Sequence, residues 1–202
     1  IQALIDSLIK KSNAKIYTEQ NITKITKKGN KWIVVANETL YEFDILINTI
    51  HVSDFLELLT EELPNEIINA ARNLITNKLI NVFIGIKGEV TKKFRDLSWM
   101  YIPSWSQGYF HRISFPTTFS KNNAPENHCG INVEITALED TELWLKSDEE
   151  IKSEIITFLH EKIGLLEERQ VVFVDVIRWE HAYVIFNLEY QNNINICLLY
   201  TS

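Results

Sequence analysis

Residues 16–49 read IYTEQNITKITKKGNKWIVVANETLYEFDILINT and contain the clearest fold signal in this chain of 202 residues. Residues 22–27 and 32–36 are interpreted as strand-like runs of period two, separated by a polar turn that contains a glycine. A period of two around such a turn predicts an antiparallel hairpin. Residues 39–43 add a third strand and make the hairpin a small meander. The apolar run 45–47 then predicts a strand that is buried on both faces.

An amphipathic helix and a short strand are predicted upstream of the meander. Four apolar residues recur at the spacing of one helical face: Leu4, Ile5, Leu8 and Ile9. Residues 14–18 form an extended run that favours a strand. Because the helical pattern begins at once and Ile1 stands in place of a methionine, we expect an internal piece of a longer protein.

The pattern changes from strands to helices after residue 49. Ser53 or Asp54 can cap a first helix, and Pro64 can start a second helix that ends near Asn77. This change of pattern predicts a domain boundary near His51.

The rest of the chain predicts one antiparallel sheet with a long helix. The strand candidates are residues 78–87, 98–102, 109–115, 130–136 and 171–179. A helix that Ser147 or Asp148 can cap carries an apolar stripe and ends at Gly164, before the last of these strands. The predicted fold class is therefore α/β, with a meander and return strand joined to an α+β domain whose antiparallel sheet is flanked by helices.

Composition and charge exclude several classes of partner. The formal net charge is −7 and the lysines form no basic stripe, so no nucleic acid is expected as a partner. No apolar run approaches the roughly 20 residues that cross a bilayer, so no transmembrane segment is predicted. Cys129 and Cys197 offer neither a metal-binding pair nor a disulfide framework, which favours a reducing compartment. We therefore expect a cytoplasmic location.

Common catalytic and phosphate-binding motifs are absent. The sequence contains no GxGxxG or GxxxxGKS, so it offers no recognisable backbone cradle for a pyrophosphate. It also lacks HExxH, paired CxxC and GxSxG, and its five histidines have no ligand spacing. The sequence thus predicts no metal site and no catalytic residue.

The final six residues, CLLYTS at positions 197–202, coincide with the translation of an adapter used in sequencing libraries. We expect this segment to be a scar and exclude it from fold reasoning. The natural protein is then expected to continue beyond Ile196.

Residues 16–49, quoted above, resemble the meander and return strand of the FAD domain in the amine oxidase and protoporphyrinogen oxidase superfamily. The resemblance implies FAD as the cofactor. It further implies that Ile22 contacts the adenosine part of FAD through its backbone, and that the strand ending near Thr49 approaches the cofactor. The alternative for Ile22, a strand residue that packs inward, is compatible with this role.

Residues 98–125, SWMYIPSWSQGYFHRISFPTTFSKNNAP, resemble bacterial members of this superfamily that are related to UDP-galactopyranose mutase and protoporphyrinogen oxidase. The resemblance implies that Tyr101 and Arg112 lie in the substrate pocket, with the arginine facing the diphosphate of a sugar nucleotide. A planar guanidinium suits that role because it donates two parallel hydrogen bonds to phosphate oxygens. The alternative for Arg112 is an exposed strand residue or a surface ion pair.

Residues 181–196, HAYVIFNLEYQNNINI, resemble the segment that returns from the substrate domain to the FAD domain. The resemblance implies that Tyr183 lies near the flavin and the substrate. A buried strand tyrosine with a satisfied hydroxyl is the alternative.

Together these resemblances imply a partial, Rossmann-like FAD-binding domain at residues 1–50, a substrate-binding domain at 51–185 and a return segment at 186–196. The implied function is that of an FAD-dependent oxidoreductase acting on a small molecule, with this fragment inactive by itself. A flavin-dependent sugar-nucleotide mutase and a non-catalytic domain that binds a ligand or partner remain the alternatives. The oligomeric state is not predicted.

Overall fold

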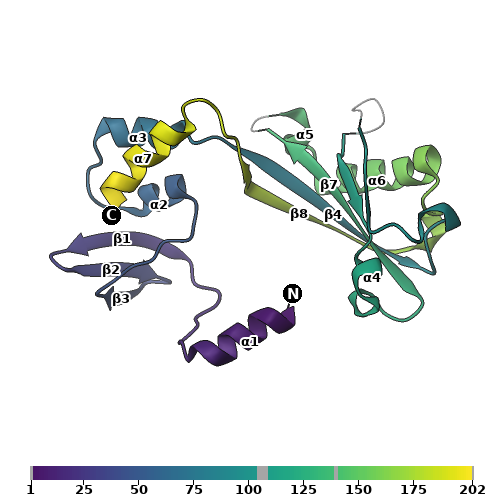
Figure 1. Ribbon diagram of the computed structural model, residues 1–202, viewed down its shortest axis with the longest axis horizontal. Coiled ribbons are helices and arrows are strands. Elements are labelled where there is room, and N and C mark those ends of the chain that lie inside the picture. The colour runs from purple at the N-terminus through teal and green to yellow at the C-terminus, as the bar shows by residue number, and fades with distance from the viewer. Residues whose placement is uncertain (1, 104–108, 139–140, 202) are drawn as a thin grey trace. The chain divides into compact units, whose positions relative to one another are not determined.

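Three antiparallel strands form the meander predicted from the opening stretch. In the computed structural model, which describes residues 2–103, 109–138 and 141–201, these strands are β1 (Ile22–Lys28), β2 (Lys31–Ala36) and β3 (Thr39–Phe43). The sheet order is β1-β2-β3, and Figure 1 shows the three strands as consecutive arrows. Gly29 has a φ of +62° in the first turn, where a residue with a side chain would be strained. The hairpin prediction is confirmed.

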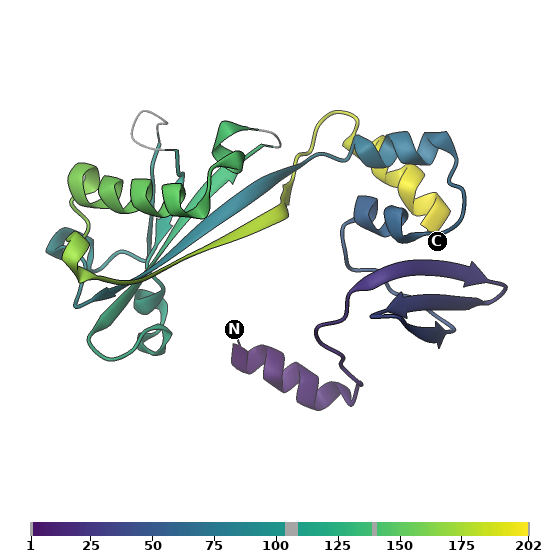
Figure 2. The ribbon, with the colours of Figure 1, turned by 180° about the vertical axis from the view of Figure 1, so that it is seen from behind.

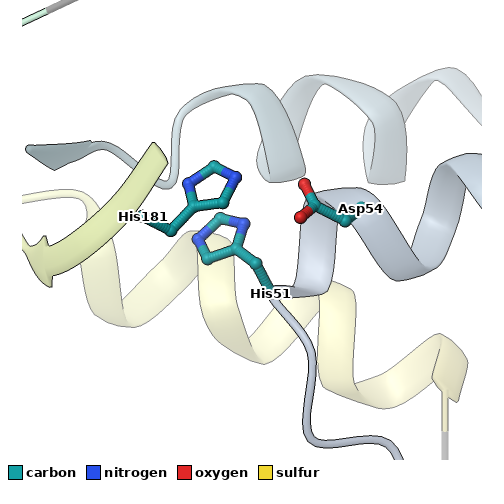
Figure 3. A group of neighbouring side chains, drawn as sticks. All are labelled: His51, Asp54 and His181. Atoms are coloured by element: carbon teal, nitrogen blue, oxygen red, sulfur yellow. The ribbon is translucent and has the colours of Figure 1, made fainter. Parts of the chain in front are cut away.

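Two short helices follow the meander. α2 (Val52–Leu58) begins directly after His51, and Asp54 lies in its first turn (Figure 3). The chain after α2 pairs with the meander, since the Thr60 backbone N–H donates to the Ile25 carbonyl at 3.1 Å. The contact fixes this helix against β1.

α3 (Asn65–Arg72) starts after Pro64, as predicted. It ends at Arg72 rather than near Asn77, and the next strand begins at Thr76. α1 (Gln2–Ser12) is also helical as predicted, but it buries none of its residues. No helix in the described part of the chain is long and apolar enough to cross a lipid bilayer.

Two predicted strands do not form. Residues 14–18 and 45–47 are extended without strand pairing, and the Ile45 and Ile47 side chains are 78% and 82% exposed. A strand buried on both faces needs hydrogen-bonded neighbours and covering layers. The residues that the structure describes supply neither for these two runs.

The sheet that follows contains five antiparallel strands. They are β4 (Thr76–Lys87), β5 (Trp99–Tyr101), β6 (Arg112–Ser114), β7 (His128–Ala137) and β8 (Val171–Val184). The order across the sheet is β5-β6-β7-β4-β8. All five predicted strand regions are confirmed, with β8 longer than predicted and β6 shorter.

Helix α6 (Asp148–Thr157) lies across one face of this sheet (Figure 2). It continues as one wider turn, Phe158–Ile163, and ends at Gly164, whose φ of +63° suits glycine. The core between helix and sheet is made of fully enclosed aliphatic side chains, among them Ile80, Val82, Ile113, Val133, Ile135, Ile151, Ile155 and Leu159. This apolar core covers the face of the sheet next to α6. The side chains that alternate with it along the strands therefore project from the opposite face.

The chain divides into two compact units. The meander unit comprises the residues up to Asn73 together with those from Gln191 onward, and the sheet unit comprises Leu74–Tyr190. α7 (Tyr190–Thr201) thus belongs mostly to the meander unit, where its Asn193 is buried. The units divide the chain at other points than the predicted boundary near His51, because α2 and α3 group with the meander. The predicted assignment of domains to functions stays a prediction.

The N-terminus of α6 supports a first stability prediction. The Ser147 Oγ accepts a hydrogen bond from the Glu150 backbone N–H at 3.3 Å, and the Glu150 carboxylate accepts one from the Ser147 backbone N–H at 2.9 Å. We expect Ser147→Ala to lower the free energy of unfolding by about 1 kcal/mol, because an N–H group of the first turn loses its acceptor. Urea unfolding followed by circular dichroism measures the change. Ser153→Ala, an exposed change within α6, is the control and should cost nothing; equal losses would contradict the capping role.

Candidate functional site

The face of the five-stranded sheet opposite α6, here called the open face, carries polar and aromatic side chains. Residues that pair directly across neighbouring strands project from the same face. One row crosses all five strands: Tyr101, Arg112, Glu134, Asn81 and Ile177. The next row also crosses all five: Trp99, Ser114, Asn132, Phe83 and Asp175. The open face therefore has polar groups at its centre and rings along its edges.

An ion pair lies in the middle of the first row. The Arg112 Nε donates to Glu134 Oε1 at 2.9 Å, and a terminal nitrogen of the same guanidinium donates to Glu134 Oε2 at 2.5 Å. The Glu134 residue is only 6% exposed. Its hydrogen bonds to the guanidinium raise the pKa of Arg112 above its usual range, with a further contribution from a hydrogen bond to Tyr101. Both partners of this pair are charged, and their charges cancel.

His111 lies beside the ion pair. Its Nε2 is 3.9 Å from Glu134 Oε2, and its Nδ1 is 3.2 Å from the Thr136 hydroxyl. Burial lowers the pKa of His111, and the positive charge of Arg112 lowers it further, against the opposing effect of Glu134. The ring is therefore neutral at pH 7, and the group adds no net charge to the open face.

Two asparagines at the centre of the open face do not use all of their hydrogen-bonding groups. The side-chain oxygens of Asn81 and Asn132 are buried, and neither has a hydrogen-bond partner within the described residues. Asn81 pairs directly with Glu134, while Asn132 precedes Glu134 by two residues on β7. Buried polar atoms in folded proteins nearly always have partners, so two neighbouring acceptors without one indicate a place for a donor from outside the sheet.

Two glycines open a groove at one end of the open face. Gly85 of β4 pairs with Gly130 of β7, so no side chain rises from the sheet between them. The groove has a volume of about 740 Å³, and Pro116, Phe83 and Phe173 are among its walls. Its lining is mainly apolar, which suits the packing of a hydrophobic group.

Three predicted substrate-binding residues come together on the sheet unit. Tyr101 pairs with Arg112 across β5 and β6, and the Tyr183 hydroxyl lies within electrostatic range of the Arg112 guanidinium. Tyr183 is exposed, unlike the buried tyrosine of the alternative interpretation. Arg112 does form an ion pair, as its alternative interpretation held, but with a buried carboxylate rather than a surface one. Whether the three bind substrate stays a prediction.

Sequence reasoning did not single out Glu134, Asn81 or Asn132. Their signal is visible in hindsight, because a carboxylate and two amides stand inside strands that are otherwise rich in isoleucine and valine. Period-two alternation assigns such residues to the face away from the core. It does not reveal which strand lies next to which, and hence that the three residues are neighbours.

A known protein family matches most of this chain. The family model described as flavin containing amine oxidoreductase matches residues 1–190. The chain belongs to this family. No curated protein matches the sequence. The family's flavin cofactor was implied by the resemblances in the sequence, and the match confirms that superfamily assignment.

Solved structures share the fold of this amine oxidoreductase chain. A reduced UDP-galactopyranose mutase is similar with a TM-score of 0.79 and 18% identity, over 96% of this chain and 41% of the mutase. A putative protoporphyrinogen oxidase from Exiguobacterium sp. is similar with a TM-score of 0.74 and 14% identity, over 97% and 42% of the two chains. A variant of putrescine oxidase gives a TM-score of 0.62 at 11% identity, over 87% and 38%. The chain thus spans about two fifths of the length of these proteins.

Ile22, predicted to contact the adenosine of FAD, lies at an outer edge of the meander sheet. Ile22 begins β1, an outer strand of its sheet, so one side of its main chain has no strand neighbour among the described residues. The preceding turn is held in place by Asn37, whose side-chain oxygen accepts a hydrogen bond from the Asn21 backbone N–H at 3.0 Å. Main-chain groups in such a fixed, accessible edge can contact an adenosine. Thr49 is exposed in the segment that leads to α2.

Proposed function

We propose that the complete gene product is an FAD-dependent oxidoreductase and that this chain supplies its substrate-binding surface. The observation that carries the proposal is the open face of the five-stranded sheet, with its buried ion pair and its exposed rings, in a chain of the flavin containing amine oxidoreductase family. A sheet face that carries buried polar groups is suited to orient a small molecule. Fold alone would not support this choice.

Each predicted site residue has a physical task in this proposal. A bound flavin would supply the hydride acceptor. The main chain at Ile22 and the segment around Thr49 would contact the cofactor. Tyr101, Arg112 and Tyr183 would contact the substrate, with the hydroxyls as hydrogen-bonding groups and the rings as flat packing surfaces.

The chemistry left to the protein is orientation and exclusion of water. His111 is held neutral, Arg112 is held charged, and Glu134 is engaged in two hydrogen bonds. None of these groups is placed to exchange a proton freely with a ligand. This agrees with hydride transfer to a cofactor, which needs a well-positioned substrate more than an acid and base pair.

A flavin-dependent mutase acting on a sugar nucleotide is the second candidate. It is supported by the likeness to UDP-galactopyranose mutase and by the pairing of Tyr101 with Arg112. In this candidate the flavin would act without net redox change, and Arg112 would bind the diphosphate. A non-catalytic protein that binds a ligand or partner is a third candidate.

The proposed protein acts on a small molecule in the cytoplasm. The two cysteines of the sequence offer no disulfide framework, which supports the proposed reducing compartment.

The visible spectrum of the purified complete gene product tests the proposal. We expect the absorption of an oxidised flavin, which disappears on anaerobic reduction by the true substrate and returns with oxygen or another electron acceptor. Heat release and mass spectrometry should identify the cofactor as FAD. A flavoprotein that converts a UDP-sugar only after prior reduction would favour the mutase instead. A protein that is colourless and takes up no added FAD would contradict both flavoenzyme candidates and favour the third.

A further inference from the structure

The buried carboxylate of Glu134 occupies one of the two edges of the Arg112 guanidinium that can bind an anion through two hydrogen bonds. Phosphate and carboxylate groups bind arginine strongly through two parallel hydrogen bonds, and Nε with a terminal nitrogen is one pair of donors that can make them. In this structure both of those nitrogens donate to Glu134, at 2.9 and 2.5 Å. At this edge an incoming phosphate would have to displace a carboxylate that cannot turn into solvent, because Glu134 lies within the sheet and is 6% exposed.

The charges around Arg112 also disfavour an anion. The positive charge of Arg112 and the negative charge of Glu134 cancel each other. The neighbouring His111 is neutral because burial lowers its pKa. A phosphate near this group would meet the Glu134 charge with no cation left to balance it. At short range and away from bulk water, such repulsion is large enough to decide which ligands bind.

The two asparagines beside the ion pair favour a ligand that donates hydrogen bonds over an anion. The buried side-chain oxygens of Asn81 and Asn132 accept no hydrogen bond from the described residues. A ligand that brings O–H or N–H donors would satisfy both. A phosphate, which has only acceptors when fully ionised, would satisfy neither. Exposed rings at both edges of the same face, Tyr101 and Trp179, offer surfaces on which a planar group can stack.

We propose that Glu134 makes the open face selective for uncharged ligands that donate hydrogen bonds, with Asn81 and Asn132 as the acceptors that bind them. Glu134 acts as a positioning residue, because it works by holding Arg112 away from phosphate groups. This inference deepens the proposed function and rests on it, since it names the substrate class of the same surface. It also separates the oxidoreductase from the sugar-nucleotide mutase, which would need Arg112 for a diphosphate.

Two probes that share a ring and differ in charge test the inference. Uridine carries O–H and N–H donors without charge, and uridine diphosphate adds two phosphates. We expect the complete gene product to bind uridine more tightly than uridine diphosphate in isothermal titration calorimetry. Glu134→Gln keeps the shape of the side chain but removes its charge. It should raise the affinity for the diphosphate by roughly tenfold or more and change that for uridine much less.

Matched variants separate this role from a structural one. Glu149→Gln makes the same change on the exposed surface of α6 and should leave both affinities unchanged. Asn132→Leu keeps a similar volume and removes an acceptor that has no partner. It should weaken uridine binding by roughly tenfold while leaving the urea midpoint unchanged or raised. An asparagine with only a structural role would lower that midpoint and leave the preference between the probes intact.

The outcomes are separable from those of the proposed function. Flavin absorbance of the same samples tests the flavoenzyme independently of either probe. Diphosphate binding that exceeds uridine binding, and that falls in Arg112→Ala, would overturn the inference and leave the flavoenzyme standing. Absence of uridine binding, or an unchanged preference in Glu134→Gln, would overturn it as well. A colourless protein with the expected preference would remove the flavoenzyme alone.

Discussion

We expect Ile80→Ala to lower the free energy of unfolding of the sheet unit by about 2–5 kcal/mol, the largest stability change in this set. Ile80 is 0% exposed and belongs to the apolar core between β4, β7 and α6. Its truncation removes buried methyl groups and leaves a cavity that the surrounding strands cannot close. A domain of this size has about 5–15 kcal/mol in total, so the loss is a large fraction. Urea unfolding followed by circular dichroism measures it.

Ile177→Ala is the matched control for Ile80→Ala. Ile177 lies on the neighbouring strand β8, but its side chain points to the open face and the residue is 39% exposed. The same truncation there removes less buried surface and creates no closed cavity. We expect a loss of about 1 kcal/mol or less. Similar losses at the two positions would mean that the face covered by α6 is not the tightly packed one.

The second large effect is expected for Arg178→Met, at about 2–4 kcal/mol. Arg178 of β8 donates to the carbonyl oxygens of Trp144 and Lys146, both at 2.6 Å, and to the Asp148 carboxylate at 2.8 and 3.0 Å. It thereby joins the sheet to the start of α6. Methionine keeps the length of the side chain but donates no hydrogen bond, so two carbonyl groups and a carboxylate lose their partner.

Arg169→Met serves as the control, since Arg169 is an exposed residue of the same unit. Its replacement should change the free energy of unfolding by no more than about 0.5 kcal/mol. Limited proteolysis adds a second measurement: the chain near Ser147 should be cut faster in Arg178→Met than in the wild type or the control. An unchanged cleavage rate would contradict the role of Arg178 in fixing the start of α6.

Much of the fold could be predicted because its signals are local. The meander follows from strand-like runs on either side of the turn at Gly29, and the bounds of α6 follow from the cap at Ser147 and from Gly164. The strand predicted at 45–47 was wrong for a reason that is not local. An apolar run becomes a buried strand only where other strands pair with it, and hydrophobicity by itself cannot supply them.

For the candidate site too, some residues could be predicted from the sequence and others could not. Tyr101, Arg112 and Tyr183 were reached through a resemblance, and the structure places them near one another. Glu134 could not be reached, because its importance arises from the register between β6 and β7, which brings it opposite Arg112. Register is a long-range property, since it depends on how residues more than twenty positions apart align.

The discontinuous make-up of the meander unit has a consequence for biosynthesis. Within this chain its strands are synthesised before the sheet unit, whereas the residues of its helix α7 are synthesised after the sheet unit. Contacts between such distant segments close large loops and therefore form late. During translation the sheet unit can complete its core while the meander still lacks its last helix. Chaperone association with nascent chains should accordingly persist until the residues after Tyr190 have emerged.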